Sequence, residues 1–157
     1  MFDIITFGSA AQDIIVKPKH LTMLEYTKEN LGKEVCFPIG GKIDIEHMDF
    51  YSGGGGTNTT ATFALQGFKT AFCGTIGKDA SGQEVLDELK KLKVNTSLVK
   101  KTDKKITNHS IVISSGNQDK TILVYRGAAE LMGKKDIPWG KLKTRWIYLA
   151  PLSGLLC

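Results

Sequence analysis

The order of apolar and polar residues along the chain predicts strands that alternate with helices. Residues 3–8 form an apolar, β-branched run closed by a glycine, which is typical of a central strand. Residues 70–76 and 145–150 have the same character. Because helices and glycine-rich turns separate these strands, the pattern indicates an α/β domain with a mainly parallel sheet.

Two helices are predicted between these strands. An apolar helix follows Gly53–Gly56 and stops before Gly67, which is well placed as the residue just after a helix end. A second helix opens at Ser81–Glu84, where a serine and a glutamate have the spacing of a capping box. The apolar residues of this second helix share one face: Val85, Leu86, Leu89 and Leu92.

Several short strand candidates do not fit this rhythm. Residues 14–16 extend the chain after the first strand, and residues 19–31 are polar and predict a loop or an irregular helix. The other candidates are residues 34–37, 42–45, 110–115 and 121–125. The last two flank Gly116-Asn117, which is a hairpin signal. We expect these segments to form a small separate β-layer.

The composition is that of an ordinary soluble globular domain. The chain has 157 residues, of which 41% are hydrophobic and 24% are charged, and this excludes disorder as the main state. No apolar run approaches the roughly 20 residues of a membrane helix, and the N-terminus lacks the pattern of a secretory signal. The three cysteines are widely spaced without a C-x-x-C pair, which favours reduced thiols in a cytoplasmic protein over a zinc site or disulfides.

The net charge of +5 comes almost entirely from lysine, because Arg126 and Arg145 are the only arginines. Residues 90–105 hold seven lysines and one aspartate. One interpretation is a patch that binds RNA, which predicts salt-dependent binding to unrelated RNAs. The interpretation that we favour is a solvated helix end followed by a loop, because charge runs are usually surface features.

The aromatic and histidine residues give no separate signal of chemistry. We expect Trp139 and Trp146 in the core rather than on a platform for nucleic-acid bases. The scattered His20, His47 and His109 are expected at the surface.

The run Gly53–Gly56 is the most informative feature of the sequence. Glycines before a helix allow the backbone to approach a ligand closely, and the amides of the helix start would face that ligand. A flexible turn is the alternative, but four glycines lose conformational entropy without helping packing. Neither phosphate-binding motif fits, because Thr59 replaces the last glycine of G-x-G-x-x-G and Asp79 follows Gly77-Lys78.

Two polar residues lie close to this run in the predicted elements. Asp13 follows the first strand, where its carboxylate can accept hydrogen bonds from sugar hydroxyls. Asn58 offers a donor and an acceptor at the start of the helix. For each residue alone, a structural role as a turn residue or helix cap is the competing explanation.

These motifs together resemble the ribokinase-like (PfkB) family of sugar and nucleoside kinases. Four ordered matches are much more specific than a lone glycine motif. The main match resembles the first signature of the family: Gly53-Gly54-Gly55-Gly56-Thr57-Asn58, then Thr60, Gly67 and Gly77. The other matches are Phe7-Gly8-Ser9 through Asp13, Gly77-Lys78-Asp79 through Gly82, and Tyr125-Arg126-Gly127-Ala128.

The resemblance implies a Rossmann-like (ribokinase-like) α/β fold, with a mainly parallel sheet flanked by helices and a small β-sheet lid. Residues 1–157 would be the N-terminal portion of one such domain, with the C-terminal part missing. The lid segments would lie near residues 14–18, 33–52 and 109–126. In this family the lid is often paired between subunits, so the resemblance also implies a possible homodimer.

The function implied by the resemblance is ATP-dependent phosphorylation of a hydroxyl of a sugar or nucleoside. Asp13, Gly54, Gly55 and Asn58 would bind the substrate, and Arg126 receives a weaker assignment to the same site. ATP and Mg²⁺ would be cofactors of the full-length enzyme. We expect this chain alone to bind neither of them, and to contain no metal ligand and no catalytic residue.

Departures from the family pattern limit these expectations. Gly55 stands where sugar kinases often have lysine, Ala11 replaces a frequent asparagine, and Leu152-Ser153 lie where an acidic residue is found. The identity of the sugar therefore stays open. The second signature, Asp-x-x-Gly-Ala-Gly-Asp, supplies the anion hole and the aspartate base in the family, and it is absent from this sequence.

We therefore expect the substrate-binding half of a kinase, inactive alone, whose partner is the C-terminal half of the same fold. The alternative is a non-catalytic module that binds a sugar or nucleoside, or that dimerises through the lid. Neither hypothesis involves nucleic acid or a membrane.

Overall fold

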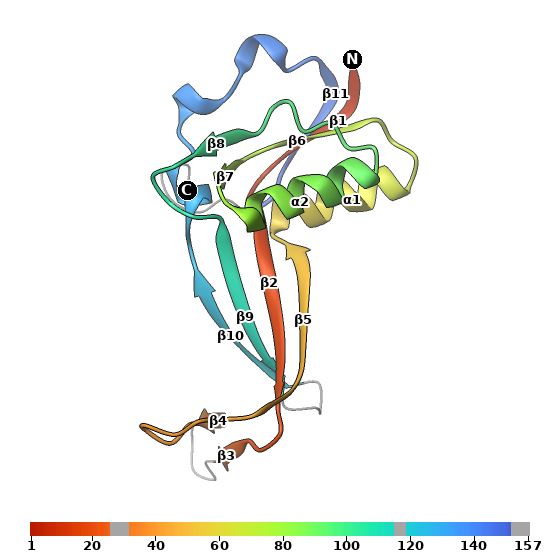
Figure 1. Cartoon of the computed structure of the whole chain (residues 1–157). Coiled ribbons are helices and arrows are strands. Elements are labelled where there is room, and N and C mark those ends of the chain that lie inside the picture. Colours follow the sequence, from red (N-terminus) through yellow and green to blue (C-terminus); the bar gives the residue numbers. More distant parts are fainter. Residues whose placement is uncertain (26–31, 115–118, 152–157) are drawn as a thin grey trace.

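The computed structural model describes residues 1–25, 32–114 and 119–151. Its centre is a parallel sheet with the strand order β11-β1-β6. These strands are β1 (Phe2–Phe7), β6 (Thr70–Cys73) and β11 (Thr144–Leu149). Their parallel pairing confirms the predicted α/β sheet, and Figure 1 shows it beside the two helices.

Strands β1 and β6 of this sheet are buried on both faces. On one face, Phe72 of β6 packs against the apolar side of helix α2 (Ala80–Lys91), where Val85 and Leu86 are buried. On the other face, Ile5 and Cys73 pack with residues of the segments that lead into and out of the central strands. Burial raises the pKa of the Cys73 thiol to about 12, so this cysteine stays protonated and belongs to the core.

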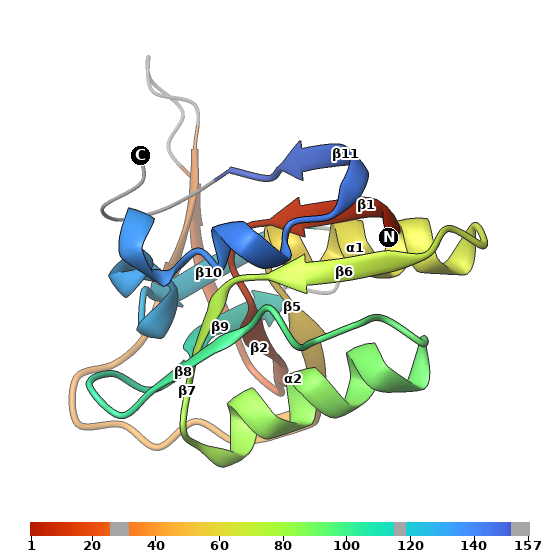
Figure 2. The same cartoon turned by 90° about the horizontal axis from the view of Figure 1, so that it is seen from above.

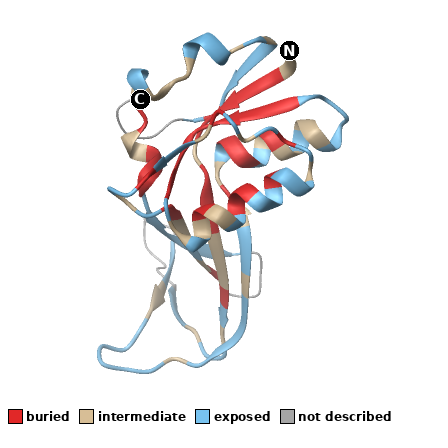
Figure 3. Ribbon diagram, turned by 45° about the horizontal axis from the view of Figure 1, so that its top comes forward, coloured by how far each residue is buried: buried red, intermediate tan, exposed pale blue. Residues whose placement is uncertain are grey.

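A second, mixed sheet projects away from the helices and the central sheet (Figure 1). Its strand β9 runs parallel to β2, whereas the two outer pairs are antiparallel. We call it the projecting sheet, and its order is β10 (Lys120–Tyr125), β9 (Asn108–Ser114), β2 (Ala11–Pro18) and β5 (Ile45–Gly53). Figure 3 shows that most of it is exposed, in contrast to strands β1 and β6 of the central sheet.

The remaining elements of the described chain are two helices, two small two-stranded sheets and three 3-10 turns. Figure 2 shows α1 behind β1 and β6, and α2 running roughly parallel to α1 at the lower edge of the view. The other elements are α1 (Gly55–Leu65), β3 (Thr22–Glu25), β4 (Lys33–Cys36), β7 (Thr75–Gly77), β8 (Lys100–Thr102) and 3-10 turns at Ala128–Leu131, Lys134–Asp136 and Trp139–Lys141. No helix in the described ranges is long and apolar enough to cross a membrane.

Three of the predicted boundaries were wrong. Residues 42–44 are not a strand, and β5 runs from Ile45 to Gly53, the two ends of its pairing with β2. Part of the predicted loop forms β3, which pairs with β4. The predicted strand over 70–76 is divided into β6 and β7. Gly116-Asn117 lies outside the described residues, although β9 and β10 on either side pair antiparallel as expected.

The aromatic and histidine expectations were also partly wrong. Trp139 is 64% exposed on a 3-10 turn and Trp146 is 71% exposed on β11, which is the edge strand of the central sheet. Both faces of β11 are largely uncovered among the described residues, which leaves the Trp146 side chain in solvent. His109 is half-buried at the base of the projecting sheet rather than at the surface, and its imidazole is hydrogen-bonded on both sides.

Several lysines of the segment 90–105 form ion pairs at the surface. Lys90 forms an ion pair with Asp87, Lys105 with Glu130, and Lys100 with Asp136. Part of this segment is strand β8, parallel to β7. These pairs neutralise several of the lysines locally, which agrees with the surface interpretation that we favoured.

The N-terminus of α2 is capped by Asp79, and this corrects the capping box predicted at Ser81–Glu84. The Asp79 carboxylate accepts hydrogen bonds from the Gly82 amide at 2.8 Å and from the Thr107 amide and hydroxyl, each at 2.7 Å. Partial burial alone would raise the pKa of Asp79, but these hydrogen bonds, with a smaller contribution from His109, lower it overall. One carboxylate therefore ties the start of α2 to the segment before β9.

We predict that Asp79→Ala lowers the free energy of unfolding by about 3 kcal/mol at pH 7, since a helix cap and the bonds to Thr107 are lost together. Because the pKa of Asp79 is lowered in the folded state, its stabilisation is complete above the unfolded-state pKa and is lost as the pH falls through the folded-state pKa. The difference between wild type and variant in urea denaturation should therefore shrink below about pH 4.

The control is Asp103→Ala, which removes an exposed ion pair with Lys78 at 3.7 Å and should cost less than about 1 kcal/mol. Equal losses for the two variants at pH 7 would contradict the role assigned to Asp79.

Candidate functional site

The site is organised around Asp13 of β2 and Gly53 of the neighbouring strand β5. A Cβ atom placed on Gly53 would lie 2.5 Å from Cγ of Asp13 and 2.8 Å from its Oδ1. The carboxylate therefore lies directly on the α-carbon of Gly53, a position that any larger residue would occupy itself. Asp13 is half-buried, and its carboxylate forms no hydrogen bond or ion pair within the described ranges.

The glycine run packs tightly against the turn after β1. Gly54 has φ +104°, and a Cβ on it would lie 2.5 Å from the Ser9 carbonyl oxygen. A Cβ on Gly56 would lie 2.7 Å from the Phe72 ring and 2.8 Å from Gly8. The run therefore does help packing, contrary to our expectation. Gly55 differs, because it is exposed and its Cβ position is 3.4 Å from the Ala150 side chain.

The amides at the start of α1 are already engaged. The amides of Gly56 and Thr57 donate to the Ser9 carbonyl at 3.1 and 3.3 Å, and the Gly55 amide donates to Ser9 Oγ at 3.3 Å. We had expected these amides to face a ligand, and that expectation was wrong for these three. The helix cap is Gly54 rather than Asn58. The Asn58 side chain is exposed and, among the described residues, has no hydrogen-bond partner.

Four of the five predicted site residues come together. Asp13 contacts the end of β5, and Gly54, Gly55 and Asn58 follow directly in the loop and the first turn of α1. Arg126 is more distant, because it follows β10 and strand β9 lies between β10 and β2. Its side chain is exposed, and within the described ranges it forms no hydrogen bond with the other four.

The projecting sheet adds side chains that the sequence did not identify. Asp13 lies opposite Tyr51 of β5 and opposite Ser110 of β9. Directly opposed residues share one face of a sheet, so the Tyr51 ring and the Ser110 hydroxyl flank the carboxylate. Tyr51 is 53% exposed. Tyr51 was missed because the residue pattern gave no strand over 45–53, and Ser110 was missed because its pairing with Asp13 depends on strand register.

Asn108, at the start of β9, holds the turn that carries Arg126. Its buried Oδ1 accepts hydrogen bonds from the amides of Gly127 at 3.0 Å and Ala129 at 3.1 Å. One side chain thus orders the chain after β10. Nothing in the sequence pattern distinguished this asparagine from an ordinary strand residue.

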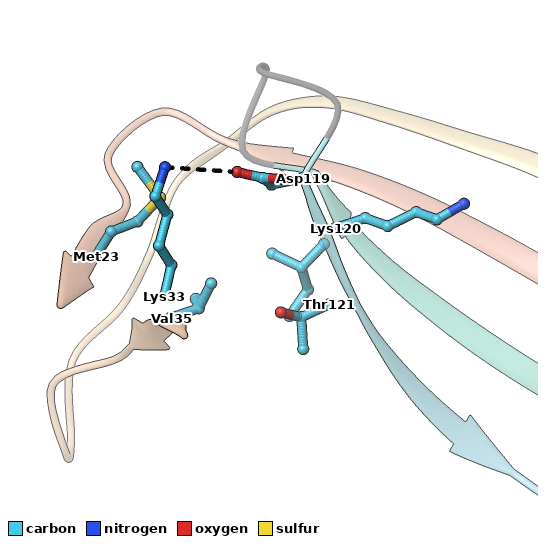
Figure 4. A pocket seen from close by; sticks show the side chains of 7 residues that line it. Met23, Lys33, Val35, Asp119, Lys120 and Thr121 are labelled. Atoms are coloured by element: carbon cyan, nitrogen blue, oxygen red, sulfur yellow. Dashed lines mark ion pairs between the residues drawn. The ribbon is translucent and has the colours of Figure 1, made fainter. Parts of the chain in front are cut away.

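A separate hollow lies at the far end of the projecting sheet. Figure 4 shows Met23, Lys33 and Val35 facing Asp119 and Thr121, with Lys33 Nζ 3.9 Å from the Asp119 carboxylate. The hollow has a volume of about 330 Å³. None of the five predicted site residues lines it, so it is distinct from the site at Asp13.

The described residues do not fit a metal ion or a nucleotide phosphate chain. No group of three or more His, Cys, Asp or Glu side chains that could hold a metal occurs among them. The start of α1 is engaged by Ser9, and the start of α2 is capped by Asp79, so neither helix offers free amides to a phosphate at those positions. What these residues offer is hydrogen bonding, with an acceptor at Asp13 and a donor and an acceptor at Asn58.

Comparison with known proteins identifies the class to which this fold and site belong. The model of the pfkB family of carbohydrate kinases matches residues 3–148, so the chain belongs to that family. The ribokinase of Schizosaccharomyces pombe (strain 972 / ATCC 24843) is 30% identical over 135 residues, which are 82% of this chain and 37% of that protein.

Solved structures share the ribokinase-like fold. Ribokinase from Cryptococcus neoformans var. grubii serotype A, in complex with ADP, has a TM-score of 0.70 and 18% identity, over 95% of this chain and 42% of that chain. Ribokinase from Thermotoga maritima has a TM-score of 0.72 and 21% identity, over 90% and 42%. A nucleoside kinase from Methanocaldococcus jannaschii has a TM-score of 0.68 and 22% identity, over 95% and 44%. The chain spans less than half the length of these relatives.

We predict that Asn108→Ala lowers the free energy of unfolding by about 2–3 kcal/mol, because two amides lose a buried acceptor. Asn108→Asp keeps an oxygen acceptor at this position and should recover part of that loss. Urea denaturation measures both variants.

The matched control is Asn58→Ala, whose exposed side chain should change stability by less than about 0.5 kcal/mol. If Asn108→Ala is as stable as this control, the Asn108 side chain does not hold the turn.

Proposed function

We propose that this chain binds a sugar or nucleoside and presents one of its hydroxyls for phosphorylation by ATP. The observation that carries this proposal is the Asp13 carboxylate, held against Gly53 and left without a protein partner in the described ranges. A half-buried carboxylate accepts hydrogen bonds strongly, and hydroxyl groups are the donors that a sugar provides. Membership in the pfkB family of carbohydrate kinases supports the same function.

The chain's own residues bind and orient the acceptor. Asp13 accepts hydrogen bonds from acceptor hydroxyls, and Asn58 contributes a donor and an acceptor from the first turn of α1. Gly55 is exposed in the loop before Asn58. Holding the acceptor in one orientation accelerates phosphoryl transfer by replacing a random encounter with a positioned one.

The projecting sheet acts as a lid in this proposal. Tyr51 and Ser110 lie on the same face as Asp13 and extend the acceptor site along the sheet. The Tyr51 ring can cover an apolar face of the sugar or base while its hydroxyl stays in water. A cover of this kind excludes water from the acceptor, which suppresses transfer of phosphate to water.

The nucleotide and the catalytic base belong, in this proposal, to a further portion of the family fold. The sequence contains no Gly-Ala-Gly-Asp segment, and the amides at the described helix starts are already engaged by Ser9 and Asp79. Strand β11 offers a place for that portion, because it is an edge strand with both faces exposed. Its exposed residues are Trp146, Ile147, Tyr148 and Leu149. The 157-residue chain alone is then inactive.

The opposite face of the projecting sheet favours a homodimer. The residues opposed to Ile14 are Phe50 and Ile111, and Leu123 lies opposite Ile111, which makes a row of apolar side chains. A hollow of about 300 Å³ continues this apolar face past Val16. We propose that a second copy of the chain covers it, because a large exposed apolar face marks an interaction surface.

The described cysteines are free thiols, which supports a cytoplasmic location.

A non-catalytic module that only binds a sugar or nucleoside is the competing function. It shares the acceptor site but needs no further portion of the fold. The two are distinguished by adding the C-terminal portion of a family enzyme and measuring sugar-dependent formation of ADP. Restored turnover supports the kinase, and binding that is never converted to turnover supports the module.

We predict that Gly53→Ala weakens ribose or nucleoside binding about 100-fold in isothermal titration, because the new methyl group displaces the Asp13 carboxylate. The free energy of unfolding should change by less than about 1 kcal/mol, since only a side-chain end must move. Asp13→Asn should weaken binding in the same direction.

The control for this prediction is Gly140→Ala, since nothing lies within 4 Å of a Cβ at that position. Unchanged affinity in Gly53→Ala would refute the acceptor site. Sugar-dependent ADP formation by the wild-type 157-residue chain alone would instead refute its inactivity.

We also predict that Leu123→Glu shifts the chain towards monomer in sedimentation velocity, because it places a charge on the apolar face. The matched control is Ile122→Glu, the adjacent residue of β10 on the opposite face of the sheet. A dimer that survives Leu123→Glu, or one that both substitutions disrupt equally, would contradict the assigned interface.

A further inference from the structure

The base of the projecting sheet is joined to α2 by a row of polar side chains. Gln12 of β2 lies opposite Ser52 of β5 and opposite His109 of β9, so all three share the face opposite to Asp13. Helix α2 supplies their partners. Ser52 Oγ is hydrogen-bonded to Glu88, and Gln12 Nε2 donates to Glu84 Oε2 at 2.6 Å.

This row continues through a serine to the histidine. Ser81 Oγ lies 2.7 Å from Gln12 Oε1 and 3.1 Å from His109 Nε2. The other ring nitrogen, His109 Nδ1, lies 2.8 Å from the Thr107 carbonyl oxygen. The chain of contacts therefore runs from Glu84 through Gln12 and Ser81 to His109, and it links two strands of the projecting sheet to one helix.

The protons in this chain can be assigned from its fixed acceptors. Glu84 is a carboxylate, so Gln12 directs its amide nitrogen towards it and its carbonyl oxygen towards Ser81. That carbonyl can only accept, so the single Ser81 proton is donated to it. The Thr107 carbonyl can also only accept, so His109 Nδ1 carries a proton.

One contact then depends on the charge of the imidazole. With the Ser81 proton already donated, the contact between Ser81 Oγ and His109 Nε2 needs a proton from the histidine. Only the imidazolium carries protons on both nitrogens. In the neutral ring, Ser81 must give up either Gln12 or His109.

The charged groups near the ring are acidic. Helix α2 contributes Asp79, within electrostatic reach of the ring, and Glu84 and Glu88 along the same row. The remaining neighbour that can titrate is Tyr125 of β10, directly opposite His109. A positive ring facing these carboxylates completes the row without an unpaired charge.

We propose that His109 is a positioning residue, whose protonation completes this chain and holds β2 so that Asp13 faces the acceptor. This rests on the proposed acceptor site. Gln12 and Asp13 are consecutive in β2 and point to opposite faces, so tying one to α2 orients the other. Because histidine changes charge between about pH 5 and 8, acceptor binding strengthens as the pH falls through that range.

The first measurement needs no acceptor. Hydrogen-exchange protection of the β2 amides, corrected for intrinsic exchange, should rise about tenfold from pH 8 to pH 5.5 in the full wild-type chain. Ser81→Ala keeps the imidazole but removes the hydroxyl that links Gln12 to His109, so the rise in protection should disappear. His109→Gln places a permanent amide donor towards Ser81 and should give high protection at both pH values. His47→Gln, at an exposed histidine paired with Asp49, should retain the wild-type rise.

The second measurement is ribose affinity by isothermal titration at the same two pH values. We expect the affinity of the wild type to rise about tenfold from pH 8 to pH 5.5. The three variants should change in the same way as they do in the exchange measurement. If ribose and nucleosides bind at neither pH, the proposed acceptor site fails while the exchange measurement still decides the role of His109. Protection of β2 that does not change with pH in wild type, or that changes equally in Ser81→Ala, would overturn the proposal.

Discussion

The Asp13 carboxylate lies on the α-carbon of Gly53, and this contact between two neighbouring strands orders the rest of the site. It places a carboxylate without a described protein partner at the end of β5, where the chain turns into α1. The Ser9 carbonyl and hydroxyl then engage the first amides of that helix, and close contacts with Gly54 and Gly56 hold the loop against the turn after β1. The glycines thus serve the packing that brings the carboxylate to the surface.

The two faces of the projecting sheet have different chemistry at this level. One face carries Asp13 between Tyr51 and Ser110. On the other face, the preceding residues of β2 and β9, Gln12 and His109, point towards α2. Farther from the helix, that second face becomes apolar. Acceptor binding, attachment to the helix and dimerisation are therefore assigned to different parts of a single sheet, as its alternating side chains allow.

The sequence predicted those strands and helices whose apolar residues recur at a regular spacing. Residues 3–8 and the apolar face at Val85 and Leu86 were predicted because burial on one or both sides imposes a regular pattern. Strand β5 was missed because both its faces are largely exposed, so no such pattern forms. Asp13 was identified through its place in a motif, but its contact with Gly53, like the bonds of Asn108 and His109, joins residues distant in sequence and depends on strand register.

Family membership and the span of the chain together frame the functional account. The chain belongs to the pfkB carbohydrate kinases and covers less than half the length of its ribokinase relatives. Acceptor binding is the part of the family's activity that we propose for its residues. A crystal structure of the chain grown with ribose tests this most directly. The account predicts ribose hydroxyls about 2.5–3.0 Å from the Asp13 carboxylate, which remains over Gly53. Ribose bound elsewhere, or a carboxylate turned away from Gly53, would contradict it.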